Sequence, residues 1–284
     1  MRNSVKTWVL IGPGLGWISL LLVIPCALIF VYAFFERGVY GGVDYIFTFE
    51  NFQRAFDPLY MGIFLQSAKI AGLATLISIL IAYPTAAAIT QAPRQWQTVL
   101  LILVIMPFWS NYLIRTYAWI VMLNREGLIN NGLAYLGVID DPLPLLYNNF
   151  AVVTGLVYNY TPFVVLAIYS SLTRINPEII EASYDLGGSG WTTFRRVTLP
   201  QTVSGAAAGG VFVFVLSIGN FITPDLLGGG RVQMVGNLIY DQFLSARDWP
   251  FGAALSLFLI LVMMALLFTQ AVLTNRAAGD RGAA

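Results

Sequence analysis

Six long runs of this sequence contain no aspartate, glutamate, lysine or arginine, and they limit the possible folds more than any other feature. A helix needs about 20 apolar residues to cross the ~30 Å hydrocarbon core of a bilayer. Evenly apolar runs of this length predict helices rather than barrel strands, because the backbone in hydrocarbon must satisfy its own hydrogen bonds. The third run is expected to continue past Arg115 to Leu123. The six expected spans are Thr7 to Phe35, Ile70 to Pro93, Gln95 to Ile114, Pro142 to Thr173, Val197 to Pro224 and Trp249 to Asn275.

The composition agrees with a membrane-embedded chain. Only 10% of the 284 residues are charged, whereas soluble globular domains carry about 25%. Hydrophobic residues make up 58% and are spread along the whole length. We therefore expect an all-α integral membrane protein in which residues 1–284 form a single transmembrane domain surrounded by the lipid bilayer. The net charge of +1 gives no reason to expect a nucleic-acid partner.

The missing residue types exclude most catalytic sites. The chain has no histidine and one cysteine, which removes Ser-His-Asp and Cys-His catalytic sites and most zinc sites. Its two lysines, Lys6 and Lys69, do not follow a glycine-rich loop, so the phosphate-binding loop of ATPases cannot form. We expect no enzymatic activity, no metal and no cofactor, with any ATP bound by a partner subunit.

The distribution of charge predicts the orientation in the membrane. Basic residues near span ends tend to stay cytoplasmic. With both termini inside, the inner side carries eight basic and four acidic residues, and the outer side five basic and ten acidic residues. We therefore expect a multi-pass protein of the bacterial inner membrane with both termini cytoplasmic. The eight inner basic residues are Arg2, Lys6, Arg94, Arg174, Arg195, Arg196, Arg276 and Arg281.

The longest inner connection, residues 173–200, separates the fourth and fifth spans. Asn176 is a good helix N-cap and Pro177 suits the first helical position, while Gly187 with Gly188 supplies a stop. The loop should therefore form two short helices around a glycine hinge. Small and apolar side chains share one face of the first helix, which suits docking into a groove of a partner. They are Ile179, Ala182, Ser183 and Leu186.

This loop resembles the signature of permease subunits in binding-protein-dependent ABC importers. That signature reads Glu-Ala-Ala, three residues, Gly, nine residues and then Ile-x-Leu-Pro; here Ser183 replaces the second alanine and Val197 the isoleucine. The resemblance implies a fold like that of type I ABC importer permeases, with this loop as the coupling helix that inserts into the ATP-binding subunit. The coupling residues it implies are Glu181, Ala182, Gly187, Leu199 and Pro200.

Three further stretches resemble the spermidine and putrescine permeases within this family. They are residues 107–119 (PFWSNYLIRTYAW), 219–229 (GNFITPDLLGG) and 248–254 (DWPFGAA). The resemblance implies polyamine import in which separate subunits hydrolyse ATP. It also implies three kinds of protein partner: ATP-binding cassette subunits, a second related permease, and a periplasmic or extracellular solute-binding protein. Relatives with similar stretches carry other small nitrogen-containing solutes, such as amino-acid derivatives or opine-like compounds, and these stay open as alternatives.

A polyamine pathway needs carboxylates, amide or backbone oxygens, and aromatic faces that attract cations. Aromatic, amide and acidic side chains of this kind occur in the third to fifth spans, although such rings also serve as interfacial belts or packing residues. The candidates are Trp109, Asn111, Tyr117, Tyr158, Asn159, Tyr160, Asn220 and Asp225.

Two intramembrane cations, Lys69 and Arg115, complicate the polyamine interpretation. We expect structural pairing, for example with Asp225; if they faced the cavity instead, an anionic or zwitterionic solute would be favoured. An ion-coupled secondary carrier is a further alternative, but such carriers are expected to place acidic residues near the midplane. None of the six runs contains one.

Overall fold

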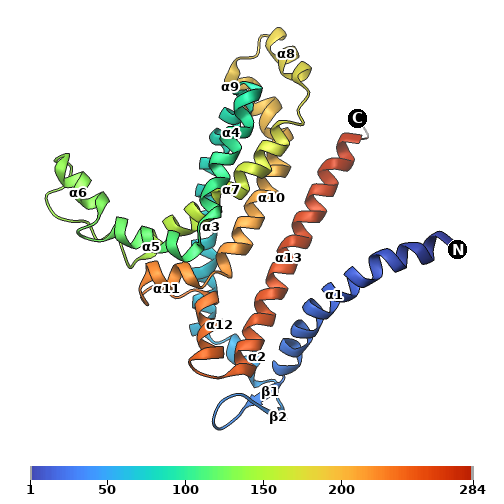
Figure 1. Ribbon diagram of the computed structural model, residues 1–284, viewed down its shortest axis with the longest axis vertical. Helices are drawn as coiled ribbons and strands as arrows, with labels where there is room; N and C mark the ends of the chain where they lie inside the picture. The colour runs from blue at the N-terminus through green and yellow to red at the C-terminus, as the bar shows by residue number, and fades with distance from the viewer. Residues whose placement is uncertain (1, 283–284) are drawn as a thin grey trace. The chain divides into compact units, whose positions relative to one another are not determined.

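The computed structural model describes residues 2–282 of the chain, and side chains from Ile11 to Val272. Five described helices are long and apolar enough to cross a membrane, and a sixth crossing exists if one bent pair of helices counts as a span. The five cover Ile11–Tyr32, Pro58–Gln91, Asn149–Leu172, Gly190–Ile218 and Trp249–Val272. The predicted all-helical, multi-span architecture is therefore confirmed (Figure 1).

Short elements connect these long helices. The first half of the chain contains α1 (Arg2–Tyr32), β1 (Phe35–Arg37), β2 (Val43–Phe47), α2 (Glu50–Ala55), α3 (Pro58–Gln91), α4 (Arg94–Ile105), the 3-10 turn η1 (Met106–Trp109), α5 (Tyr112–Leu123) and α6 (Leu128–Tyr135). The second half contains α7 (Asn149–Leu172), α8 (Pro177–Asp185), α9 (Gly190–Thr193), the π-helical turn η2 (Phe194–Thr198), α10 (Leu199–Ile218), α11 (Ile222–Gly228), α12 (Val235–Leu244) and α13 (Trp249–Gly282). The strands β1 and β2 pair antiparallel as a hairpin.

The third expected span is broken instead of continuous. Helices α4 and α5 meet at an angle of 90°, because the chain tightens into η1 at Pro107 and restarts at Asn111. Proline has no backbone N–H and disrupts the regular helical ladder, and the side-chain oxygen of Asn111 accepts a hydrogen bond of 2.8 Å from Leu113 N to cap α5. The uncharged run did predict the apolar segments, but not the bend between them.

Other expected spans also differ from the helices at their ends. The second run begins at Ile70, but α3 begins at Pro58. The fourth run begins at Pro142, but α7 begins at Asn149, where Asn148 caps it by accepting a hydrogen bond of 3.0 Å from Ala151 N. The fifth run ends at Pro224, but α10 stops at Ile218 and the chain turns into the short helix α11. The residues between Ile218 and Pro224 therefore do not extend the transmembrane helix.

Contacts among the described residues divide the chain into two compact units. The first contains the chain up to Gly62 together with Leu238–Val262, and the second contains Ile63–Asn237 and the chain from Met263 onward. The expectation of a single transmembrane domain stays a prediction. So does the orientation of the termini, since the terminal charges used to infer it (Arg2, Lys6, Arg276, Asp280 and Arg281) have side chains outside the described range.

In the second unit, α3, α7 and α10 form a closely packed core (Figure 1). Ala82 and Ala86 of α3 pack with Val164 and Ile168 of α7, and Val213 of α10 joins the same buried cluster. Two glycines of α10 allow its close approach to α7. A Cβ atom on Gly209 would lie 3.0 Å from Ala167 Cβ, and one on Gly205 would lie 2.8 Å from Ser171 Cβ. Gly205 and Gly209, four residues apart, therefore form a small-xxx-small contact at this helix pair.

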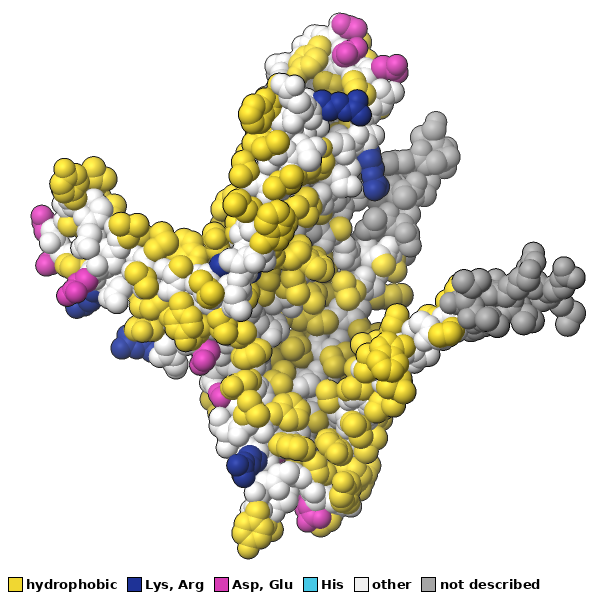
Figure 2. All heavy atoms as spheres, in the orientation of Figure 1, with side chains coloured by type: hydrophobic (Ala, Val, Ile, Leu, Met, Phe, Trp, Pro, Cys, Tyr) yellow, Lys and Arg dark blue, Asp and Glu magenta, His cyan; other side chains and the backbone are white. Residues whose placement is uncertain are grey.

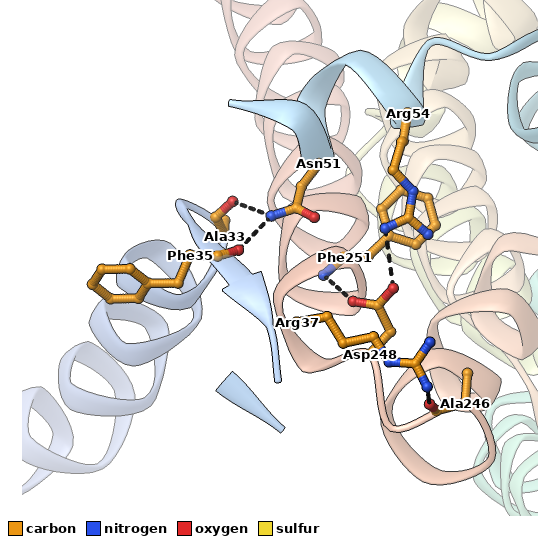
Figure 3. A network of polar contacts seen from close by, with 8 residues as sticks. All are labelled: Ala33, Phe35, Arg37, Asn51, Arg54, Ala246, Asp248 and Phe251. Carbon is orange, nitrogen blue, oxygen red and sulfur yellow. Dashed lines mark hydrogen bonds and ion pairs between the residues drawn. The ribbon is translucent and has the colours of Figure 1, made fainter. Parts of the chain in front are cut away.

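In the first unit, polar side chains join the hairpin, α2 and the start of α13 (Figure 3). Asn51 is buried and donates hydrogen bonds to the carbonyl oxygens of Ala33 and Phe35, at 3.1 and 2.8 Å. Arg54 forms an ion pair of 3.1 Å with Asp248 and lies 4.0 Å from the centre of the Phe251 ring. Asp248 also accepts a hydrogen bond of 3.2 Å from Phe251 N, which caps α13.

Candidate functional site

The loop between α7 and α10 begins with a capped helix. The side-chain oxygen of Asn176 accepts a hydrogen bond of 3.1 Å from Glu178 N, and Pro177 occupies the first turn of α8. Asn176 Nδ2 also donates to the Glu178 carboxylate at 3.1 Å. The cap that the sequence predicted is therefore formed, and it determines where α8 leaves the end of α7.

The end of α8 depends on the glycine hinge. Gly187 has a φ of +80°, a left-handed conformation that side chains other than glycine rarely adopt. Gly188 follows, and a Cβ atom on it would lie 2.6 Å from the carbonyl oxygen of Ser183. The Ser183 hydroxyl, at a position where the permease signature has alanine, bonds the hydroxyl of the buried Thr193 at 2.9 Å. This departure from the signature therefore ties α8 to α9.

Helix α9 continues into the transmembrane helix α10 through the π-helical turn η2. Leu199 N donates its hydrogen bond to Phe194 O, one residue farther back than in an α-helix. Pro200 follows in the first turn of α10, where its missing N–H is tolerated. Residues from Gly190 to Ile218 thus form one helical segment that joins the loop to a membrane span.

Most of α8 and the glycine hinge are exposed at the surface of the chain. Glu181, Ala182 and Gly187 are all exposed, and the side chain of Leu186 is 90% exposed. Figure 2 shows acidic side chains gathered over the α8 end of the second unit. Trp191, which the sequence interpretation did not single out, adds a large apolar side chain that is 68% exposed. The loop therefore presents apolar groups beside carboxylates to whatever covers it.

Aromatic contacts link this loop to α3. The Trp191 ring stacks on Phe194 at 5.4 Å, and Phe194 meets the Tyr83 ring edge to face at 5.3 Å. The Tyr83 hydroxyl in turn bonds Thr202 of α10 at 2.6 Å. Sequence analysis missed Tyr83 and Phe194, because a contact between residues more than a hundred positions apart leaves no local pattern.

Two of the eight candidate pathway residues meet in a polar cluster, which we define as Tyr112, Tyr160, Asn220 and Thr223. Asn220 Nδ2 lies 2.7 Å from each of the Tyr112 and Tyr160 hydroxyl oxygens. Asn220 Oδ1 accepts a hydrogen bond of 2.8 Å from Thr223 N, and the hydroxyls of Tyr112 and Thr223 lie 2.5 Å apart. The cluster joins α5, α7 and α11 at the turn that follows α10.

Asn159, the residue before Tyr160, is enclosed without partners. Its side chain is 1% exposed, and neither its amide nitrogen nor its amide oxygen has a hydrogen-bond partner. The Ser217 hydroxyl of α10 is also buried and without a partner. A buried primary amide without hydrogen bonds costs about 1–3 kcal/mol, so packing alone does not explain this residue.

The remaining candidates lie apart from the cluster. Asn111 is used as the cap of α5, and Trp109 and Tyr117 are 77% and 55% exposed. Tyr158 meets Trp119 edge to face at 5.5 Å. Asp225 is exposed on α11, past the end of the transmembrane helix.

The two intramembrane cations differ in their surroundings. The Arg115 guanidinium donates a hydrogen bond of 2.8 Å to Pro107 O and lies 4.7 Å from the centre of the Phe108 ring, so it holds the bend between α4 and α5. Lys69 is exposed beside a large apolar groove. Among the described residues, neither cation has a carboxylate within ion-pair distance. The expected pairing with Asp225 is therefore wrong.

Comparison with protein families gives a match over most of the chain. The model of the family "Binding-protein-dependent transport system inner membrane component" matches residues 73–278. The matched segment includes the α8 loop, α7, α10 and the part of α3 from Leu73 onward.

Individual relatives match over almost the full length. The chain is 39% identical over 284 residues to the spermidine/putrescine transport system permease protein PotB of Salmonella typhimurium strain LT2, covering 99% of both chains. It is 40% identical over 248 residues to PotB of Escherichia coli strain K12, covering 87% of this chain and 90% of that protein. A crystal structure of a bacterial alginate ABC transporter with its periplasmic protein has a chain of the same fold, with TM-score 0.80, 17% identity and coverage of 97% and 96%.

Proposed function

Because the chain belongs to the family of binding-protein-dependent transport system inner membrane components, we propose that it is the transmembrane subunit of an ABC importer for a polyamine. Spermidine or putrescine is the proposed solute, since the full-length relatives are spermidine/putrescine permeases. The observation that carries the mechanism is the exposed α8 loop, whose second part, from Gly190 onward, continues without a break into the transmembrane helix α10.

In the proposed mechanism, the loop converts ATP-driven closure of partner subunits into movement of the spans. Helix α8 with Glu181, Ala182 and Gly187 inserts into an ATP-binding cassette subunit. Leu199 and Pro200 lie where the loop enters α10 and transmit the displacement to that helix. The Phe194 to Tyr83 contact passes part of the movement to α3. The chain itself binds no ATP in this mechanism and catalyses no reaction.

The proposed assembly contains two permeases and an external solute receptor. A second, related permease completes the pathway, and a periplasmic or extracellular binding protein delivers the polyamine to the outer face. The span from Ile11 to Tyr32 is not buried against the rest of this chain. Its exposed apolar side chains support an arrangement in which lipid and neighbouring subunits cover it. Both termini are proposed to lie in the cytoplasm.

The proposed solute pathway passes the polar cluster and Asn159. Tyrosine faces and hydroxyls, together with amide oxygens, suit an alkylammonium group, which needs acceptors and π-faces. Trp109, Asn111, Tyr117 and Asp225 extend this set along the route, whereas Tyr158 lines the apolar groove beside Lys69 and is left out of the proposed pathway. Lys69 is not part of the proposed solute pathway, because its ammonium group repels a polycation.

Charge reversal on α8 tests the coupling role. In the assembled transporter, Glu181→Lys should reduce recovery of the ATPase subunit roughly tenfold, as expected when an interface hot spot is lost, and should abolish spermidine uptake. The matched control is Glu126→Lys, an exposed charge reversal in the loop before α6, which should leave recovery and uptake unchanged. Normal ATPase recovery and normal uptake with Glu181→Lys would refute the coupling role.

A further inference from the structure

A large apolar groove lies on the second unit. Its volume is about 960 Å³, and residues of α3, α4, α5 and α7 line it. Leu73, Ile81 and Leu103 are among these residues and are 49%, 46% and 55% exposed, so the groove is open to its surroundings along this side. We define this site as the α3–α7 groove.

A polyamine does not fit this groove chemically. No aspartate or glutamate belongs to its lining, and its charged member is the cation Lys69. Like charges repel strongly where the surroundings are apolar. The groove therefore needs an occupant with a long apolar part and an anionic group.

The position of Lys69 fits the boundary between hydrocarbon and headgroups. At about 1.5 Å per residue, Lys69 lies roughly 33 Å along α3 from its end at Gln91, close to the ~30 Å thickness of the hydrocarbon core. Arg94 follows at the Gln91 end, so Lys69 marks the opposite, outer boundary in the predicted orientation.

The groove extends from that boundary over about one leaflet. Leu73, Ile77 and Ile81 follow Lys69 along the groove side of α3, and Lys69 and Ile81 are separated by about 18 Å along the axis. One leaflet is half of the ~30 Å core. An acyl chain whose head is held at Lys69 would thus lie along the groove for its whole length.

The start of α7 adds partial positive charge at the same level. A hydrogen bond of 3.1 Å joins Thr161 of α7 to Ser78 of α3. Eight residues earlier on each helix, Ile70 of α3 lies in one buried cluster with Val153 of α7. The two helices therefore run in the same direction, and their contacts keep the same spacing. Asn149 and Phe150 of the first turn line the groove. First-turn N–H groups have no acceptor within their own helix, and the N-terminal end favours anions.

From this combination we infer that the α3–α7 groove is a phospholipid site. The lipid phosphate would be held by the Lys69 ammonium near the start of α7, and an acyl chain would lie against Leu73, Ile77 and Ile81. The site is separate from the polar cluster proposed for the solute, and it stabilises this flank of the permease in the outer leaflet.

Photo-crosslinking in the assembled transporter tests this inference. A photoreactive amino acid replaces Leu73 in the groove, or Leu76 as the matched control. Leu76 lies one helical turn away and is 55% exposed, but it is not part of the lining. The complex is reconstituted in phosphatidylethanolamine and phosphatidylglycerol, irradiated, and measured by intact-protein mass spectrometry.

The expected result is a phospholipid adduct at position 73 that exceeds the adduct at position 76. Lys69→Gln should reduce the position 73 adduct about fivefold, the effect of one lysine charge near a membrane surface, while leaving the position 76 adduct unchanged. Equal labelling at both positions, insensitive to Lys69→Gln, would show ordinary surrounding lipid and overturn the inference. A crosslink from position 73 to a protein subunit would overturn it as well, because a partner helix would then fill the groove.

Discussion

Asn159 of α7 and Asn220 of the turn after α10 are two amides with opposite hydrogen-bond states. Asn220 uses its nitrogen and its oxygen within the polar cluster, whereas Asn159 is buried with neither atom bonded. A satisfied amide stabilises the fold, and an unsatisfied one destabilises it. The hydrogen bonds of Asn220 therefore hold the described conformation, and we propose that the Asn159 amide meets solute or water in another conformation.

Substitution of Asn159 by leucine, of similar size, should separate these roles. Asn159→Leu removes an unpaired amide and should stabilise the protein by about 1–3 kcal/mol, seen as a higher unfolding temperature in detergent. Spermidine uptake should fall, because the pathway loses an acceptor. Asn220→Leu is the matched control and should lower the unfolding temperature. If Asn159→Leu keeps full uptake, Asn159 does not belong to the pathway.

At the scale of elements, the contact between α7 and α10 depends on glycines of α10, which have no side-chain atoms to hold the helices apart. A Cβ atom on Gly205 would overlap the Ser171 hydroxyl oxygen and lie 2.9 Å from Ala167 O. Helices in lipid associate through close packing and not through the hydrophobic effect, so small residues at the interface matter more than apolar ones. The close approach of α10 to α7 therefore rests on this contact.

Alanine substitution on α10 and α3 tests this packing. Gly205→Ala should destabilise the protein by about 1–3 kcal/mol through overpacking. Gly72→Ala on α3, where nothing lies within 4 Å of the added Cβ atom, should be neutral or stabilise by up to about 1 kcal/mol. Thermal unfolding of the two variants, followed by fluorescence, measures the difference. Equal effects would mean that close packing at α7 and α10 is unimportant.

The bend between α4 and α5 is a second element-scale feature held by one side chain. Arg115→Met removes the hydrogen bond to Pro107 O and the contact with the Phe108 ring. We expect a loss of about 1.5–3 kcal/mol, because a hydrogen bond from a charged donor is lost, while Pro107 O keeps its hydrogen bonds from Ser110. Arg94→Met, an exposed arginine at the start of α4, should change stability by less than about 0.5 kcal/mol. Unchanged stability of Arg115→Met would assign the bend to Pro107 alone.

At the scale of the whole molecule, much of the surface along the long helices is apolar. Large apolar side chains are exposed along the long helices, among them Trp17, Leu80 and Phe268, at 65%, 64% and 72%. Exposure of this kind is normal toward lipid and toward neighbouring subunits. The α8 loop presents exposed apolar and acidic groups, and neither lysine of the sequence follows a glycine-rich loop. The proposed function therefore requires other polypeptides.

Reconstitution with defined subunits tests this requirement. Proteoliposomes containing the chain, a second related permease, the ATPase and the receptor should take up spermidine on ATP addition. Omitting either the second permease or the ATPase should reduce uptake to background. Without the second permease the pathway is incomplete, and without the ATPase nothing drives the change between its outward-open and inward-open states. An ATPase variant unable to hydrolyse ATP is the control for assembly. Uptake by the lone chain under an ion gradient would support the secondary-carrier alternative instead.

Several features of this protein could be predicted from the sequence alone because they depend on neighbouring residues. Uncharged runs report which segments can lie in hydrocarbon, and the Asn176 cap and the Gly187 stop act within one turn of themselves. The spacing from Glu181 to Pro200 and the family match describe the same loop. Family membership and the all-helical, multi-span fold were therefore predictable.

The tertiary structure alone decided which distant residues meet. The break at Pro107, the exclusion of Asp225 from the cluster and the pairing of Asn220 with Tyr112 depend on contacts between helices. The surroundings of the two cations depend on such contacts as well, because Arg115 is bonded to a carbonyl oxygen and Lys69 faces an open groove. In a membrane nearly every helix surface is apolar, so sequence patterns show poorly which face of a helix packs inward. That choice is made by shape complementarity and by the few polar groups that find partners.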